Sequence, residues 1–346
     1  MLIKTDDYPF ERIPAPLLSW YDREKRDLAW RKNSDPYRVW VSEIMLQQTR
    51  VEAVKEYYDR FMKALPTVES LASVEEDKLL KLWEGLGYYS RARNLQKAAK
   101  LVVEAGGFPQ EVKELEKLPG IGAYTAGAIA SIAFGKRAPA VDGNVFRVVS
   151  RLTENPTPID EPKYRGYLEE KLSAIYPIEG KRCSDFTQSL MELGALVCKP
   201  QAPACGACPL QEICRARGSG KQLEFPVLPE KKAKRVEKLF VFLLKKGDGV
   251  FVEKRKSGLL KGTYGFPMSK RGEKEVDKIL NEWGVSAFTE EKRQSFTHIF
   301  THVKWEMVCV VGRVEEAPFE WASLARLEGE LSLPTAFKQC LKAIEK

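Results

Sequence analysis

The chain lacks the features that would place it in a membrane or outside the cell. No run of about 18 apolar residues occurs, which is roughly the length that a membrane-spanning helix needs. The N-terminal segment MLIKTDDYPFERIP has no apolar core and no cleavage-like site of small residues, so no signal peptide is expected. We therefore expect a cytoplasmic protein.

Histidine is scarce, and the cysteines do not form an even set. The only two histidines are His298 and His302, and on a strand or hairpin their spacing need not direct both rings at one metal ion. The seven cysteines are an odd number, which argues against a disulfide framework and for a reducing compartment. Cys183, Cys309 and Cys340 are scattered, as small buried hydrophobic residues are.

Size and composition are those of a globular protein with more than one domain. The length of 346 residues favours two domains, and 44% hydrophobic residues suffice for ordinary cores. The formal net charge of +8 is compatible with a polyanionic partner. A basic protein without a nucleic-acid partner would have the same charge, so charge alone leaves both alternatives open.

The apolar pattern predicts a mainly α N-terminal half, at 1–217. Apolar residues recur at three- and four-residue steps in 39–61, 79–103 and 164–175, as on one face of a helix. Residues 218–237 contain glycine, proline and the basic run KKAKR at 231–235. This composition predicts an interdomain linker.

The pattern of the C-terminal part, 238–346, predicts a small α+β domain. The segments KLFVFLL and VFVEKRK flank Lys246-Gly247-Asp248-Gly249, which is a hairpin signal. A further strand is expected at 304–314, and helices at 273–283 and 335–344. No internal repeat appears.

Four cysteines near the end of the helical half carry the most information. Cys198, Cys205, Cys208 and Cys214 are separated by six, two and five residues, in a loop rich in proline. Zinc sites usually have two close cysteine pairs, and only one close pair exists here. An uneven wrap of this kind favours a 4Fe-4S cluster, with zinc or four unrelated thiols as the alternatives. The spacing resembles that of the endonuclease III superfamily of DNA glycosylases.

A glycine-containing segment, Leu118-Pro119-Gly120-Ile121-Gly122, precedes a predicted helix that starts near Tyr124. It resembles the hairpin of a helix-hairpin-helix element. Gly120 and Gly122 would permit a tight turn, and the free N–H groups of the following helix could bind a DNA phosphate. A plain helix-turn-helix connection is the alternative.

Two carboxylic acids stand in apolar surroundings. Asp142 lies in AVDGNVFR and could either cap a helix or take part in chemistry. Glu43 lies in DPYRVWVSEIMLQQT, where burial would raise its pKa and suit it to general acid catalysis. An exposed glutamate on an amphipathic helix is the alternative.

The string around Glu43, together with WEGLGYYSR at 83–91, resembles the MutY-type adenine DNA glycosylases. The resemblance runs from about Trp20 to the end and is weaker after residue 214. It implies a two-lobed helical glycosylase and a Nudix-like C-terminal domain. The implied activity is excision of adenine mispaired with 8-oxoguanine, and of adenine opposite guanine, in duplex DNA.

The resemblance also implies roles for single residues. Glu43 corresponds to the general acid that protonates adenine, and Asp142 to the carboxylate that stabilises the sugar cation. Tyr124 and Asn144 correspond to residues that orient Asp142 and the sugar. The implied adenine pocket comprises Arg26, Trp30, Arg31, Leu46 and Gln188. Gln48 and Tyr88 correspond to wedges that enter the duplex when the base is extruded.

In the C-terminal domain the resemblance rests on Phe300, Thr301 and His302, where the family usually has Phe-Ser-His on a hairpin that reaches 8-oxoguanine. Thr301 keeps the hydroxyl but adds a methyl group. The run KRGEKEVDKILNEWG lacks the acidic cluster of a working Nudix hydrolase, so a lesion reader without nucleotide hydrolase activity is expected.

Two other functions remain open on the sequence. A bifunctional glycosylase acting on damaged pyrimidines or mismatched thymine is disfavoured by Tyr124, because relatives with lyase activity carry a lysine nucleophile there and tyrosine cannot form a Schiff base. A redox-sensing iron–sulfur protein without catalysis is disfavoured by the pairing of Glu43 with Asp142. We expect a monomer, and the sequence identifies no protein partner.

Overall fold

The computed structural model describes residues 7–178, 180–230, 233–271 and 275–344. The chain forms two compact units, of which the first comprises Met1–Ala72 and Leu95–Glu230. The second comprises Ser73–Asn94 and Lys231–Lys346. The sequence did not indicate that Ser73–Asn94 groups with the C-terminal part, and the domain boundaries given above stay a prediction.

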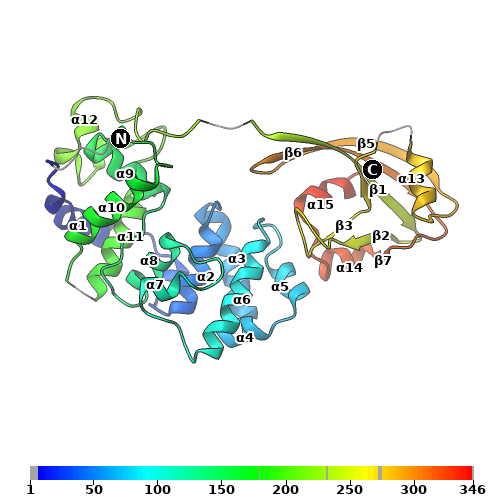
Figure 1. Ribbon diagram of the computed structural model, residues 1–346, viewed down its shortest axis with the longest axis horizontal. Coiled ribbons are helices and arrows are strands. Elements are labelled where there is room, and N and C mark those ends of the chain that lie inside the picture. The colour runs from blue at the N-terminus through cyan, green and yellow to red at the C-terminus, as the bar shows by residue number, and fades with distance from the viewer. Residues whose placement is uncertain (1–6, 179, 231–232, 272–274, 345–346) are drawn as a thin grey trace. The chain divides into compact units, whose positions relative to one another are not determined.

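The chain up to Gly218 is helical, as predicted (Figure 1). Its α-helices are α1 (Pro14–Glu24), α2 (Pro36–Leu46), α3 (Val51–Ala64), α4 (Val68–Ser73), α5 (Glu76–Leu82), α6 (Ser90–Glu104), α7 (Val112–Leu115), α8 (Ala123–Ile132), α9 (Gly143–Thr153), α10 (Pro162–Ile175), α11 (Lys181–Leu196) and α12 (Arg215–Gly218). Short 3-10 helices are η1 (Phe10–Arg12), η2 (Ala29–Arg31), η3 (Cys205–Ala207) and η4 (Gln211–Ile213).

Two long helical patterns of the sequence are each broken in the structure. The pattern at 39–61 is split into α2 and α3, because Gln48 has a φ of 59° and cannot continue a right-handed helix. The pattern at 79–103 is split into α5 and α6, where Gly85, Gly87 and Tyr88 all have positive φ. Apolar periodicity continued across both breaks, so it could not locate them.

The core of the first unit packs α1, α9, α10 and α11 together. Ile13, Leu17, Tyr164, Phe186 and Val149 are fully or almost fully buried in it. Helix α8 has no exposed polar face, and every residue from Thr125 to Ile132 is buried. Helices α8 and α9 are therefore held firmly, and each carries a candidate site residue at or near its N-terminus.

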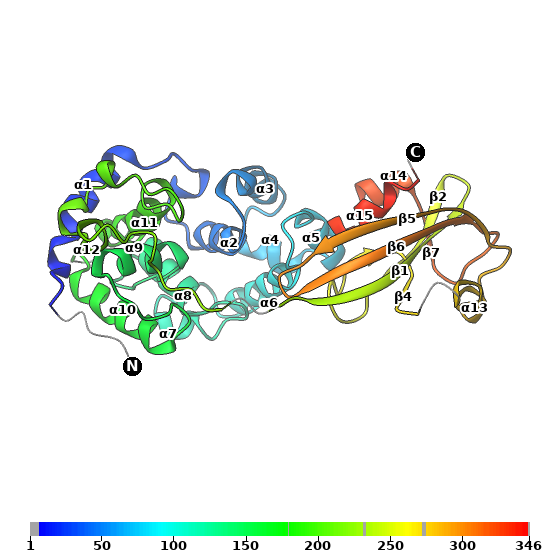
Figure 2. The same cartoon turned by 90° about the horizontal axis from the view of Figure 1, so that it is seen from above.

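The second unit is built on a sheet in which five strands follow the order β3-β2-β1-β6-β5, while β4 pairs with β1 and β7 with β2. Figure 2 shows β1, β6 and β5 side by side. The strands are β1 (Arg235–Lys246), β2 (Gly249–Lys254), β3 (Tyr264–Gly265), β4 (Met268–Ser269), β5 (Thr289–Ile299), β6 (Val303–Arg313) and β7 (Glu320–Ser323). The helices of its C-terminal part are α13 (Val276–Glu282), α14 (Leu324–Gly329) and α15 (Thr335–Leu341).

Helices cover both faces of this sheet. Leu239, Val241 and Leu243 of β1 share a core with residues of α14 and α15. Phe242 and Leu244, which point to the opposite face, share a second core with α13. Strands β1 and β6 run parallel, whereas β5 and β6 form an antiparallel hairpin.

The predicted strands and helices of the C-terminal part are confirmed, with gaps. The hairpin at Lys246–Gly249 joins β1 and β2, and the strand expected at 304–314 is β6. Strand β5 was missed because its residues are mostly polar and exposed. The helix expected at 273–283 is α13, although its first residues fall outside those that the structure describes.

The predicted linker is only partly a free connection. Phe225 is buried, and the Ile159 N–H donates to the Val227 carbonyl at 3.1 Å, so this part packs on the first unit. Arg235 already belongs to β1. Lys231 and Lys232 of the basic run lie outside the described residues. In the described part of the chain, no helix is long and apolar enough to span a bilayer.

A substitution at Gly127 tests the close packing of α8 against the backbone at Pro139, which supports the candidate site. A Cβ at Gly127 would lie 2.2 Å from the Pro139 carbonyl oxygen, which is backbone and cannot yield easily. We expect Gly127→Ala to lower the free energy of unfolding by about 1–3 kcal/mol. Gly166→Ala is the matched control, because Gly166 is helical with no atom within 4 Å of the added Cβ, and it should be neutral or stabilising. Chemical denaturation followed by circular dichroism measures both, and equal effects would contradict the packing argument.

Candidate active site

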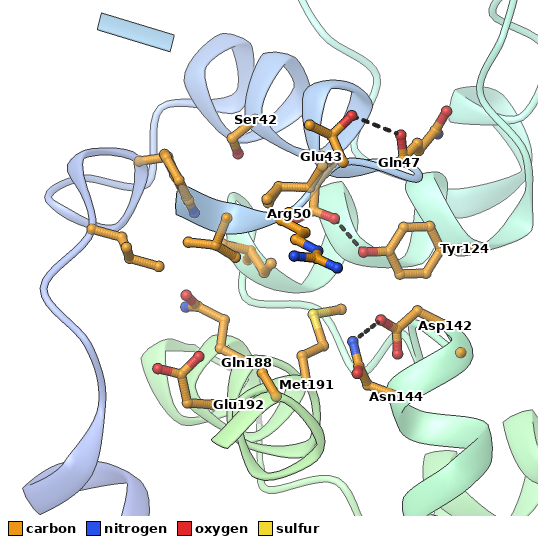
Figure 3. Close-up of a pocket in the computed structure, with 18 of the residues that line it drawn as sticks. Ser42, Glu43, Gln47, Arg50, Tyr124, Asp142, Asn144, Gln188, Met191 and Glu192 are labelled. Atoms are coloured by element: carbon orange, nitrogen blue, oxygen red, sulfur yellow. Dashed lines mark hydrogen bonds between the residues drawn. The ribbon is translucent and has the colours of Figure 1, made fainter. Parts of the chain in front are cut away.

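A cavity of about 950 Å³ in the first unit collects most of the site residues expected from the sequence. Its walls come from η2, α2, α8, α9, α10 and α11, from the segment between α2 and α3, and from the start of α3 (Figure 3). The expected residues that line it are Arg26, Trp30, Arg31, Glu43, Leu46, Gln48, Tyr124, Asp142, Asn144 and Gln188. Segments far apart in the sequence thus meet at one concave surface.

Glu43 lies in the last half of α2 and is only 6% exposed. The Tyr124 hydroxyl donates a hydrogen bond to its Oε2 atom (Figure 3). Burial raises the pKa of Glu43 to about 7, and the negative charge of Asp142 adds to this effect. The hydrogen bond from Tyr124 and the charge of Arg31 act in the opposite direction. A carboxyl with such a pKa can both give and take a proton near neutral pH.

Asp142 is the N-cap of α9, so the capping alternative is correct for its backbone position. Its Oδ1 accepts from the Val145 N–H at 2.8 Å, and its Oδ2 accepts from the Asn144 amide at 2.7 Å. Burial raises the pKa of Asp142, while these hydrogen bonds oppose the rise. The carboxylate also lines the cavity, so capping fixes a group that remains open to a ligand.

A buried ion cluster forms the opposite wall. Glu192 accepts from the backbone N–H and Nε of Arg26, both at 2.9 Å, and from Arg31 Nη2 at 2.8 Å. Burial alone would raise the pKa of Glu192, but the two arginines hold it at about 2. Glu192 was not among the site residues expected from the sequence. Its position four residues after Gln188 on one helical face was the available signal.

The remaining pocket residues have ordinary partners. The Trp30 ring packs edge-on against Tyr58 with centroids 5.3 Å apart. Gln188 donates to the Ser184 hydroxyl at 3.0 Å. Met191 lines the cavity as well, and no motif or pattern pointed to it.

The expected DNA-contacting residues lie at sharp backbone turns. Gln48, at the cavity rim, has a φ of 59° although it is not glycine. Tyr88 has a φ of 47°, is 42% exposed and belongs to the second unit. Gly120 has a φ of 79°, and Gly122 caps α8 without a side-chain hydrogen bond. The first N–H groups of α8 are thus left for an external acceptor.

Phe300, Thr301 and His302 form the turn between β5 and β6, in the second unit. The Phe300 N–H donates to the Val303 carbonyl at 2.8 Å, which closes the turn. The half-buried Phe300 ring packs edge-on against Trp305, with centroids 4.8 Å apart. Thr301 is exposed, and its hydroxyl has no partner among the residues that the structure describes.

The four cysteines of the predicted cluster loop, Cys198, Cys205, Cys208 and Cys214, line one small apolar cavity together with Val148, Leu152 and Leu193. Within the described residues, no three His, Cys, Asp or Glu side chains converge on a single ion position. Four thiols around an apolar cavity fit a cubane cluster, whose four irons each take one thiolate. These cysteines would hold the cluster through their four thiolates, and the bound cluster would cross-link the loop.

Hydrogen bonds connect this loop to the candidate active site. Arg147 Nε donates to the Cys198 carbonyl at 2.8 Å, and Arg147 Nη2 donates to Asn144 Oδ1 at 2.8 Å. Asn144 in turn donates to Asp142. Gly194 lets α11 approach closely, because a Cβ there would lie 2.6 Å from the Asn144 Cβ.

Family profiles match three parts of the chain. Residues 41–174 match the HhH-GPD superfamily of base excision DNA repair proteins, and residues 240–343 match the NUDIX domain. Residues 198–214 match the iron–sulfur binding domain of endonuclease III. These matches confirm the predicted fold class and the 4Fe-4S loop, and they favour iron–sulfur over zinc.

Curated relatives carry one name. A rat adenine DNA glycosylase is 47% identical over 231 residues, covering 62% of this chain and 44% of the relative. The chain spans less than half the length of the rat, mouse and human relatives that it matches. An adenine DNA glycosylase of Buchnera aphidicola subsp. Schizaphis graminum is 33% identical, covering 88% of this chain and 87% of the relative.

Solved structures show a related helical fold. A thermostable thymine-DNA glycosylase matches with a TM-score of 0.55 and 29% identity, covering 61% of this chain and 97% of that chain. Endonuclease III in a non-covalent DNA complex matches with a TM-score of 0.51 and 27% identity, covering 61% of this chain and 97% of that chain.

Substitution of Glu43 tests whether burial raises the pKa of its carboxyl group. Between pH 4.5 and about 7 the folded protein keeps a proton that the unfolded chain loses, so its stability falls as pH rises. Because glutamine cannot ionise, Glu43→Gln should stabilise the protein by on the order of 1–3 kcal/mol at pH 8 and much less at pH 5. Chemical denaturation at both pH values measures the difference. The same substitution at exposed Glu24 should give no such gain, and a pH-independent effect at Glu43 would contradict the raised pKa.

Proposed function

We propose that this chain, which belongs to the adenine DNA glycosylase family, hydrolyses the N-glycosidic bond of adenine mispaired with 8-oxoguanine, or with guanine, in duplex DNA. The observation that carries the proposal is the presence of two carboxyl groups, Glu43 and Asp142, in different environments on one cavity. Pairs of acids whose surroundings separate their protonation are typical of glycosidic bond cleavage.

Base extrusion comes first in the proposed reaction, because the bond cannot be reached inside the base stack. The cavity of about 950 Å³ has room for a nucleoside. Trp30, Leu46 and Gln188 supply apolar and amide surface for the adenine. Arg26 and Arg31 keep fixed positions through Glu192, so this wall needs no rearrangement when the base enters.

Glu43 donates a proton to the departing adenine, and Asp142 stabilises the positive charge that develops on the sugar. Protonation makes the base a better leaving group, and a nearby anion stabilises the oxocarbenium-like species that remains. After departure of the base, the Glu43 carboxylate can take a proton from the attacking water. Asn144 keeps the Asp142 carboxylate in place through its amide hydrogen bond.

The proposed reaction stops at the abasic site. Tyr124 hydrogen-bonds Glu43 and has no amine with which to form a Schiff base. Borohydride should therefore trap little covalent complex with abasic DNA, and efficient trapping would sink this part of the proposal.

Duplex DNA is the proposed partner. Gly120 and the open N-terminus of α8 offer N–H groups to a phosphate. The strained turns at Gln48 and Tyr88 fit residues that enter the base stack, since such strain persists where function requires it. The proposed reader of 8-oxoguanine is the turn formed by Phe300, Thr301 and His302. This turn exposes the Thr301 hydroxyl, and the packing of the Phe300 ring against Trp305 holds the turn in place.

A direct test uses single-turnover base release from duplexes with one 8-oxoguanine:adenine pair, followed by cleavage of the abasic site with hot alkali. Guanine:adenine and 8-oxoguanine:cytosine duplexes serve as comparisons. We expect cleavage of the adenine strand that requires alkali and is fastest opposite 8-oxoguanine. An intact cluster with no release from any duplex would reject the proposed function.

The pH dependence of this reaction tests the two carboxyl roles. Glu43 must be protonated and Asp142 ionised, so kcat/KM should fall above pH of about 7 and again at acidic pH. In Tyr124→Phe the hydrogen bond that favours the Glu43 carboxylate is lost, so the alkaline limb should move to higher pH. Rate measurements across the pH range on both proteins decide this. An alkaline limb that stays in place would show that Tyr124 does not tune Glu43.

Substitution of Thr301 tests lesion reading. Thr301→Val removes the hydroxyl but keeps the shape, so the preference for 8-oxoguanine:adenine over guanine:adenine should fall about five- to tenfold, the value of one hydrogen bond. Thr301→Ser keeps the hydroxyl and should preserve the preference. Single-turnover rates on both duplexes give the ratios, and equal ratios for all three proteins would contradict a reading role.

A further inference from the structure

The arginine side chains on the cavity wall are only partly paired with carboxylates. Arg26 and Arg31 share the single carboxylate of Glu192. Glu52, at the edge, pairs with Lys55 at 2.8 Å. Two further arginines line the same cavity, Arg50 and Arg165, and neither belongs to the pocket expected from the sequence.

Arg165 on α10 is fixed beside Asp142. Its Nη1 donates to the Val141 carbonyl at 2.7 Å, one peptide unit before Asp142. Its guanidinium lies over the Phe146 ring, 5.0 Å from the centroid. The nearest carboxylate oxygen, on Glu169, is 3.8 Å from Nη1, and 38% of the arginine side chain is exposed. In the described part of the chain, Nη2 has no acceptor.

Arg50 lies across the rim, immediately after the turn at Gln48. It is exposed and precedes α3, where its backbone carbonyl accepts from Val54. Figure 3 shows its guanidinium directed into the cavity, toward the side where Tyr124, Asp142 and Asn144 lie. Its side chain forms no ion pair or hydrogen bond with any residue that the structure describes.

We propose that Arg165 and Arg50 bind the two backbone phosphates that flank the extruded nucleotide. This inference rests on the proposed function, because it requires the sugar to lie against Asp142. Both phosphates are attached to that sugar, so they must lie near the wall that holds Asp142. A guanidinium with a free edge binds a phosphate through two parallel hydrogen bonds.

This clamp, formed by Arg50 and Arg165, accounts for their weak pairing with carboxylates. Arg165 has one long contact, 3.8 Å, with Glu169, and Arg50 pairs with no carboxylate among the residues that the structure describes. A guanidinium without a counter-ion at the rim would oppose the positive charge that develops on the sugar. Phosphates bound to both arginines remove that opposition and hold the sugar where Asp142 can act. Arg50 and Arg165 therefore act on binding and position of the backbone, and not on the base.

The test measures binding to a duplex that carries a tetrahydrofuran abasic analogue opposite 8-oxoguanine, with each flanking phosphate in turn replaced by an uncharged methylphosphonate. For wild-type protein, one replacement on each side should weaken binding about tenfold, which is about 1.4 kcal/mol. In Arg165→Gln, the methylphosphonate that replaces the phosphate bound by Arg165 should weaken binding no further. In Arg50→Gln, the methylphosphonate on the other side of the abasic analogue should weaken binding no further. Each variant should also lower the salt dependence of binding by about one unit of slope.

Arg23→Gln is the matched control, because it removes the same charge from exposed α1, outside the cavity. It should retain both methylphosphonate effects. Arg165→Lys should recover part of the binding, since lysine keeps the charge without the planar fork. Circular dichroism confirms folding of each variant.

Methylphosphonate effects that persist unchanged in both variants would overturn the clamp. This outcome is distinct from failure of the proposed function, because binding to the abasic analogue requires no cleavage. Wild-type protein that releases adenine but shows no coupling between arginine and phosphate rejects only the clamp. Wild-type protein that releases no adenine rejects the proposed function.

Discussion

Burial of the Glu43 carboxyl is the constraint on which the rest of the site depends. A carboxyl placed in α2 among apolar residues loses its hydration, and this raises its pKa to about 7. The hydroxyl of Tyr124, from the first turn of α8, donates a hydrogen bond to the buried carboxyl group and replaces part of its lost hydration. The negative charge of Asp142 on the same cavity adds to the rise in the pKa of Glu43. The proposed chemistry uses the protonated form of Glu43 directly.

The fold supplies that constraint by holding three helices close together. Helix α8 is buried on all sides and meets the Pro139 carbonyl at Gly127, which fixes the start of the segment that leads to Asp142. Helix α11 approaches Asn144 through Gly194 and carries Glu192 on the far wall. The cysteine loop that follows α11 is tied to Asn144 through Arg147. The iron–sulfur loop can therefore act as a structural support for the carboxylate.

Features encoded by local sequence could be predicted, whereas those created by tertiary packing could not. The cysteine spacing, the Gly120–Gly122 turn and the two acids lie in short segments whose residue types are unusual, so they could be recognised. Glu192 was not among the expected site residues, because only the fold brings it to Arg26 and Arg31. The breaks at Gln48 and Tyr88 were missed, since apolar periodicity continues across them. Strand β5 was missed because its residues are polar, and it is stabilised by pairing with β6.

The ionisation of Glu43 in the free protein tests the central claim most directly. Protein labelled with 13C at the glutamate side-chain carboxyl can be titrated by NMR, and comparison with Glu43→Gln assigns the Glu43 signal. The account predicts that this signal titrates near pH 7, well separated from those of exposed glutamates. Titration of Glu43 near pH 4.5 would contradict it, because the site would then hold two ordinary carboxylates and no acid to protonate the departing base.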